Sequence, residues 1–214
     1  MKKILMVLIT ITLLLPASSL LAEEFEGVQY TIIDSSRLLN IKCSLDIRLQ
    51  QKVSKEFLKR FALKLRADEP RSYERMFIVY LLPGMINGAG AWATTHFNPN
   101  LNVRILGMTI EEEKKLKTKS KAPASDIIGE WLDETPFIGG KTTILKKNGK
   151  ILMIREFKDG SSLENEMIQK QKSGKLRFEE KGGNDFGEYY LIDSRGRLAV
   201  YDNAGLIKTM KPIK

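Results

Sequence analysis

Two side chains in the sequence, His96 and Cys43, could form a thiol–imidazole pair for nucleophilic catalysis. They are the only histidine and the only cysteine. Strands of one sheet could bring them together as a pair in which the imidazole takes the thiol proton. However, Cys43 falls on the apolar face of a predicted strand, where burial raises the pKa of a thiol. We therefore predict a structural histidine, a buried thiol and no catalytic residues.

Carboxylates beside an aromatic ring are a second catalytic signal. Glu130, Asp133 and Glu134 flank Trp131, and a carboxylate pair beside a ring can serve glycoside hydrolysis. The sequence does not give the distance between these carboxyl groups, so we interpret them as turn and surface residues. One histidine and one cysteine without closely spaced ligands do not make a metal site. We predict no metal and no cofactor.

Glycine-rich segments suggest nucleotide binding, but the spacing does not support it. Gly140-Lys141-Thr142 is similar to the end of a phosphate-binding loop, yet Thr135 stands where the motif needs its first glycine, and no helical pattern follows. The glycines at 84, 88 and 90 lack dinucleotide-binding spacing. We predict that they permit positive φ angles or a close backbone approach in a tight connection.

Polar and aromatic side chains concentrate around the segment 84–90. On a predicted strand over 91–97, alternate residues share one face, and a turn follows. Aromatic rings supply contact area while their polar atoms orient a ligand. We predict a ligand-binding site formed by Trp92, Thr94, His96, Asn98 and Trp131. Core packing of the aromatic residues is the alternative.

The first 22 residues are organised like a cleavable bacterial signal peptide. Two lysines precede an apolar run over 4–15, and small residues lead to Ala22. We predict cleavage after Ala22, with Ser19 as the alternative. The apolar run is shorter than the roughly 20 residues of a membrane-spanning helix. We therefore expect a periplasmic or secreted protein without a transmembrane span after cleavage, rather than an anchored one.

The charge balance of the chain restricts its partners. Removal of residues 1–22 lowers the net charge from +9 to +7. A basic exported protein meets anionic headgroups and acidic polymers before it meets nucleic acid. We predict an envelope protein or an anionic surface polymer as the partner, and no nucleic acid. Alternatively, scattered lysines only keep the surface soluble. The oligomeric state stays open.

The elements that must position these residues divide the chain near residue 109. In 23–108 the patterns predict a helix that begins at Ser54 and stops at 68–70. Apolar and polar residues alternate along 41–49, as in a half-buried strand. The predicted strands are 30–33, 41–49, 76–82, 91–97 and 103–106. We expect an α+β domain with an antiparallel sheet covered by one helix.

The remaining residues form two segments of different character. In 109–126, Thr109 and Glu112 predict a capping box that opens a short charged helix, followed by a linker. In 127–214, turn signals separate short segments, which predicts an all-β antiparallel meander or small barrel. We assign 163–170 to an edge strand, with a helix as the alternative. These 88 residues are few for an eight-stranded barrel that holds a ligand.

Two stretches resemble known kinds of protein. The segments 73–85 (YERMFIVYLLPGM) and 88–99 (GAGAWATTHFNP) resemble a family of bacterial exported proteins of unassigned function. That resemblance covers about residues 40–108 and implies no activity. The C-terminal part opens with Gly129-Glu130-Trp131 and is similar to small lipocalin-like β modules. Both resemblances favour binding over catalysis.

We therefore predict a non-enzymatic exported binding or interaction protein of the bacterial envelope. Two alternatives remain open. One is an envelope or extracellular hydrolase with a site near His96, and the other is a small β-barrel carrier of an apolar ligand.

Overall fold

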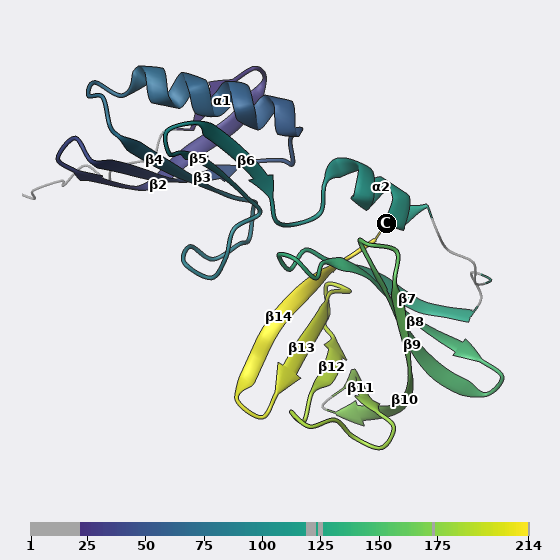
Figure 1. Ribbon diagram of the computed structural model, residues 1–214. Coiled ribbons are helices and arrows are strands. Elements are labelled where there is room, and N and C mark those ends of the chain that lie inside the picture. The colour runs from purple at the N-terminus through teal and green to yellow at the C-terminus, as the bar shows by residue number, and fades with distance from the viewer. Residues whose placement is uncertain (1–21, 119–122, 124–125, 173, 214) are drawn as a thin grey trace, which may run out of the picture.

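The computed structural model describes residues 22–118, 123, 126–172 and 174–213. Its strands form an open six-stranded sheet in the N-terminal part and a closed eight-stranded barrel in the C-terminal part (Figure 1). The predicted signal peptide lies outside the described residues except for Ala22, as does most of the predicted linker at 122–125. In the described ranges, no helix is both long enough and apolar enough to span a membrane.

The open sheet has the strand order β1-β2-β3-β4-β5-β6. Its elements are β1 (Glu23–Phe25), β2 (Val28–Leu38), β3 (Lys42–Leu49), α1 (Lys55–Asp68), β4 (Arg75–Leu81), β5 (Ala93–Phe97) and β6 (Leu101–Ile105). Neighbouring strands are antiparallel except β3 and β4, which are parallel. The prediction of a purely antiparallel sheet is therefore wrong at this pair. Helix α1 returns the chain to the end of the sheet where β3 began, so β4 runs in the same direction as β3.

Helix α1 covers one face of this sheet (Figure 1). The hydroxyl of the N-cap residue Ser54 accepts a hydrogen bond of 3.1 Å from the Phe57 amide, and the helix ends at Asp68 as predicted. The apolar side of α1 packs on alternate residues of the strands. Cys43 lies on this covered face with no exposed surface, which confirms its predicted burial.

Helix α2 (Ile110–Lys117) follows the open sheet and carries the predicted capping box. The Thr109 hydroxyl accepts from the Glu112 amide at 3.1 Å, and the Glu112 carboxylate accepts from the Thr109 amide at 2.7 Å. Leu116 packs with Met108 and Leu132 in a small core. This core joins α2 to the barrel.

The barrel closes in the order β10-β11-β12-β13-β14-β7-β8-β9. Its strands are β7 (Ile127–Asp133), β8 (Gly140–Lys147), β9 (Lys150–Phe157), β10 (Ser162–Lys172), β11 (Lys175–Glu180), β12 (Tyr189–Ile192), β13 (Leu198–Asp202) and β14 (Gly205–Pro212). The predicted barrel is thus confirmed, although eight strands close within a segment that we considered short. The segment 163–170 is a strand but not an edge strand, because β10 pairs with both β9 and β11.

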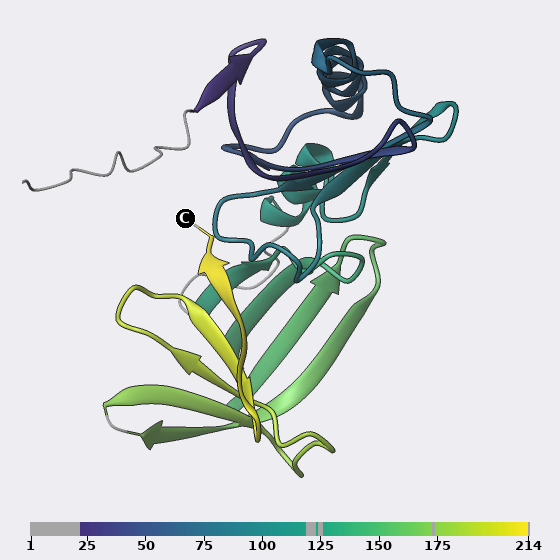
Figure 2. The ribbon, with the colours of Figure 1, turned by 90° about the vertical axis from the view of Figure 1, so that its left-hand side faces the viewer.

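Short polar contacts connect the two parts of the molecule. The Phe137 amide donates to the Leu106 carbonyl at 2.8 Å, and the Lys158 ammonium donates to the same carbonyl at 3.0 Å. The Lys52 ammonium lies 2.6 Å from a carboxylate oxygen of Glu113 and 3.0 Å from one of Glu134. Figure 2 shows α2 between the open sheet and the barrel. The end of the barrel that carries Phe137 and Lys158 therefore lies against the segment after β6.

Candidate functional site

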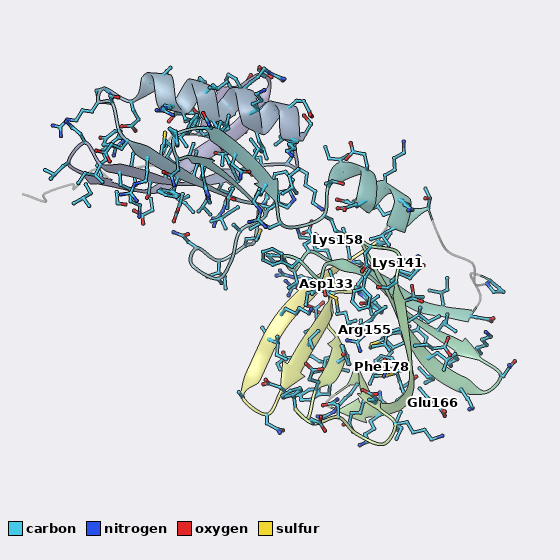
Figure 3. All side chains as sticks on the ribbon, in the orientation of Figure 1. Asp133, Lys141, Arg155, Lys158, Glu166 and Phe178 are labelled. Carbon is cyan, nitrogen blue, oxygen red and sulfur yellow. The ribbon has the colours of Figure 1, made fainter. Side chains whose placement is uncertain are left out.

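The interior of the barrel contains two layers of different chemistry. Side chains alternate across a strand, so residues two apart face the same side. The inner apolar layer includes Trp131, Ile144, Met153, Met167, Phe178 and Met210. Each of these residues has a member of the polar layer two positions away on its own strand. The polar layer consists of Asp133, Thr142, Arg155, Asn165, Glu180 and Lys208. Figure 3 shows Arg155 and Phe178 inside the ring of strands and Glu166 at its outer wall.

All six polar residues lie toward the same end of the barrel, which we call the mouth. In an up-and-down barrel alternate turns lie at one end. The mouth is formed by the turns β7–β8, β9–β10, β11–β12 and β13–β14. The barrel is therefore closed by apolar packing in its middle and is polar toward the mouth.

Hydrogen bonds connect the members of the polar layer only in part. The Lys208 ammonium lies 2.5 Å from an Asp133 carboxylate oxygen, and the Asn165 amide donates to Glu180 at 2.5 Å. Arg155 makes a single long hydrogen bond of 3.4 Å to the Asn165 carbonyl oxygen. Its Nε is buried and has no hydrogen-bond partner among the described residues. Among the residues that the structure describes, no carboxylate forms an ion pair with Arg155.

An arginine with unused hydrogen-bond donors inside a barrel can bind a negatively charged group of a ligand. Guanidinium groups present several N–H donors in one plane and bind carboxylates through paired hydrogen bonds. Arg155 is half-buried, so water does not fully screen its charge. Tyr190 lies in the same interior. Burial raises the pKa of its hydroxyl, and Arg155 opposes this shift.

Exposed apolar side chains surround the mouth. In the described part of the barrel, seven large hydrophobic residues are exposed, and six of them lie in the mouth turns or within three residues of them. These six, the apolar rim, are Phe137, Ile138, Leu163, Phe186, Leu206 and Ile207. Phe186 is 71% exposed and Phe137 is 62% exposed. Such a concentration of exposed apolar groups at one end is typical of a contact surface.

The glycine-rich loop at 84–90 lies beside this rim. A Cβ atom added at Gly90 would lie 3.5 Å from the Pro136 side chain in the β7–β8 turn. Ile86, at the tip of the loop, is 73% exposed. Gly84, Gly88 and Gly90 all have positive φ angles, as predicted. The Gly90 end of the loop thus lies against the β7–β8 turn of the mouth.

The two tryptophans of the predicted site are buried in separate cores. Trp92 is 1% exposed, and its indole N–H donates to the Met108 carbonyl at 2.9 Å. Trp131 is 2% exposed inside the barrel and donates to the Gly196 carbonyl at 2.7 Å. Neither ring presents a surface to a ligand.

The other three predicted site residues lie on the open sheet. Thr94 and His96 are half-buried on the face that α1 does not cover, and Asn98 is exposed in the β5–β6 turn. The His96 ring packs edge-on against Phe77, with 5.0 Å between ring centroids. Burial lowers the pKa of His96, and the positive charge of Arg104 lowers it further. The structure brings Thr94, His96 and Asn98 close together but separates them from Trp131.

The imagined Cys43–His96 pair does not form. Cys43 lies on the face under α1, and His96 lies on the opposite face of the same sheet. Burial raises the pKa of the Cys43 thiol, and the nearby Glu69 carboxylate raises it further. Nucleophilic chemistry at this pair is therefore excluded by the sheet geometry.

Each of the carboxylates near Trp131 forms an ion pair with a lysine. The Glu130 carboxylate lies 2.6 Å from the Lys141 ammonium on the outer wall of the barrel, whereas Asp133 points inward to Lys208. Lys141, from the rejected phosphate-loop motif, is 1% exposed. No group of three or more metal-ligating side chains occurs within the described residues.

Sequence reasoning missed the polar layer, although a signal was present. Met153 and Arg155 stand two apart on β9, as do Phe178 and Glu180 on β11. A charged residue that continues an apolar face indicates a polar position inside a barrel.

Comparison of the chain with models of protein families, with curated proteins and with solved structures gives no match. The geometry of the site is therefore the basis for the functional argument.

Proposed function

We propose that this protein is an exported, non-enzymatic binding protein of the bacterial envelope, and that the mouth of the barrel docks a segment of an envelope protein. The observation that carries the proposal is the apolar rim around a polar layer in which Arg155 has unused donors. The signal-peptide pattern of residues 1–22 supports the exported location.

The rim and Arg155 define the chemistry of the partner segment. Exposed aromatic and aliphatic side chains gain free energy when a partner removes them from water, and aromatic residues often dominate such contacts. A carboxylate on the partner would complete the hydrogen bonds of Arg155. We therefore expect a segment that presents apolar side chains around an acidic group.

The packing favours docking over the two alternatives. Ile144 and Phe178 have no exposed surface, so side chains fill the middle of the barrel where an apolar cargo would lie. Native mass spectrometry of the mature protein should accordingly show no co-purified small molecule. In the described part of the chain, His96 has no hydrogen-bonding or ion-pair partner that could orient it as a base. A hydrolase site is therefore not supported.

The proposal is tested by site-specific crosslinking in cells. A photoreactive amino acid at Phe186 should capture a partner from the envelope fraction, whereas the same group at Ile168 should not. Ile168 is also an exposed apolar residue of the barrel, but it lies in the middle of β10. Equal capture at both positions, or recovery of cytoplasmic proteins alone, would overturn the proposal.

Binding of the captured partner, once purified, then tests each part of the mouth. The Phe137→Ser/Phe186→Ser double variant should bind at least about tenfold more weakly, because two exposed anchors are lost. Arg155→Gln should also weaken binding by about tenfold or more, as expected for a charge-assisted hydrogen bond. Ile168→Ser is the matched control and should bind like the unmodified protein.

A further inference from the structure

The last strand of the open sheet has a free edge. Strand β6 pairs with β5 alone, and no described strand lies beyond it. In an antiparallel edge strand, alternate residues direct their backbone N–H and C=O groups outward, where another chain can pair with them.

Helix α1 forms a groove with this edge. Two hollows of about 510 and 560 Å³ are lined by residues of α1 and β6 and share Lys55 and Val103. Together they extend over the whole of β6, from Leu101 to Ile105. We call them the edge groove. Asn98, one of the predicted site residues, lies at one end of it.

The hollow at the Asn98 end of the edge groove has a basic wall, whereas the other hollow is lined by charges of both signs, from Lys55, Arg104, Glu56 and Glu111. The floor of the groove is apolar. Lys55 and Lys59 stand four residues apart on α1 and line the same hollow. Among the described residues, neither lysine forms an ion pair. The floor includes Val103 and Ile105, which are half-buried. The Asn98 end of the groove therefore has unused positive charge beside unused backbone hydrogen-bonding groups.

We infer that the edge groove binds an acidic, extended peptide segment, which adds to the sheet as a seventh strand. Backbone hydrogen bonds to β6 supply the pairing, and carboxylates on alternate residues of the peptide reach Lys55 and Lys59. This site is distinct from the mouth of the barrel and gives the protein a second partner.

A second copy of this chain fits the edge groove less well than an acidic peptide. Pairing two β6 strands about a two-fold axis would bring Lys55 and Lys59 of both copies near the same interface. Like charges brought together in this way repel. The charges at the Asn98 end of the groove thus favour an acidic partner.

The experiment measures fluorescence anisotropy of labelled octapeptides with the purified mature chain. A peptide of alternating glutamate and valine should bind, and the same peptide with lysine in place of glutamate should bind at least about tenfold more weakly. Two further versions of the acidic peptide carry N-methyl groups on alternate backbone amides, one version for each set of amides. The version that methylates the amides facing β6 should not bind, because those amides can no longer donate hydrogen bonds to the strand. No binding of the acidic peptide, equal binding of the glutamate and lysine peptides, or binding of both methylated versions would overturn the inference.

Matched variants separate this site from other basic surfaces. Lys55→Gln/Lys59→Gln should weaken binding of the acidic peptide roughly three- to tenfold and reduce its salt dependence. Lys146→Gln/Lys147→Gln removes the same charge at an exposed barrel hairpin and should leave binding unchanged. Phe186→Ser should also bind the peptide normally, so the edge groove can fail independently of the mouth. A dimer that dissociates when peptide is added would identify a second copy as the occupant and refute the inference.

Discussion

Replacement of Gly129 by alanine should destabilise the barrel because the Trp131 ring occupies the place of the new methyl group. A Cβ atom at Gly129 would lie 2.3 and 2.5 Å from two carbons of that ring. Such distances are far below ordinary carbon contacts of about 3.5–4.0 Å. The indole cannot withdraw freely, since it is 2% exposed and its N–H donates to the Gly196 carbonyl. The Gly-x-Trp pattern is thus a packing requirement on one face of β7.

The expected cost is about 1–3 kcal/mol, the usual range for an extra methyl group in a filled core. Trp131→Phe shortens the ring system but loses one hydrogen bond, which costs about 1 kcal/mol together with lost packing. In the Gly129→Ala/Trp131→Phe double variant the clash is relieved. The free energies of unfolding should therefore be non-additive, with the double variant more stable than the sum of the single changes by about 0.5–3 kcal/mol.

Equilibrium urea unfolding, followed by circular dichroism, measures all four proteins of this cycle. The coupling energy tests the packing argument, because it subtracts the separate costs of the two single changes from the cost of the double change. Additive effects within about 0.3 kcal/mol would show that the methyl group does not meet the ring, and the packing argument would be refuted.

Two further outcomes follow from the buried and half-buried groups of the open sheet. Burial raises the pKa of the Cys43 thiol. A disulfide reagent at about pH 8 should therefore react with the native protein at least about 100-fold more slowly than with the urea-unfolded chain. Comparable rates would contradict the burial of this thiol. The pKa of His96 is lowered in the folded state, so the imidazole binds a proton more readily in the unfolded state. The contribution of His96 to the free energy of unfolding is therefore lost as the pH falls through about 6.5. The fall in unfolding free energy between about pH 8 and pH 5.5 should therefore be smaller in His96→Gln, and an unchanged fall would contradict this assignment.

Local patterns predicted the elements whose structure depends on near neighbours. The start of α1 at Ser54 and the capping box of Thr109 and Glu112 follow from side-chain to backbone hydrogen bonds within one turn. The burial of Cys43 follows from the alternation of its own strand. These features were correct because the interactions that produce them span only a few residues.

Non-local pairing was the source of the errors. The parallel direction of β4 depends on how the chain passes through α1, and the full pairing of β10 depends on the closure of the barrel. Neither is visible in the residues of the strand concerned, since a strand's own pattern gives its buried face but not its neighbours. The candidate site was affected in the same way, because Trp92 and Trp131 were assigned by type, and their partners Met108 and Gly196 come from other segments.

The sequence by itself determined the character of each part of this protein: an export-type leader pattern, a half-buried sheet under one amphipathic helix, and short strands separated by turns. Hydrophobic periodicity and turn chemistry are local, so they can be read along the chain. Only the tertiary structure decided which residues meet. The mouth takes its side chains from strands that are distant in sequence, and the edge groove exists because the sheet ends at β6 beside α1. Both depend on the order of the strands, which is fixed only when residues distant in the sequence come into contact.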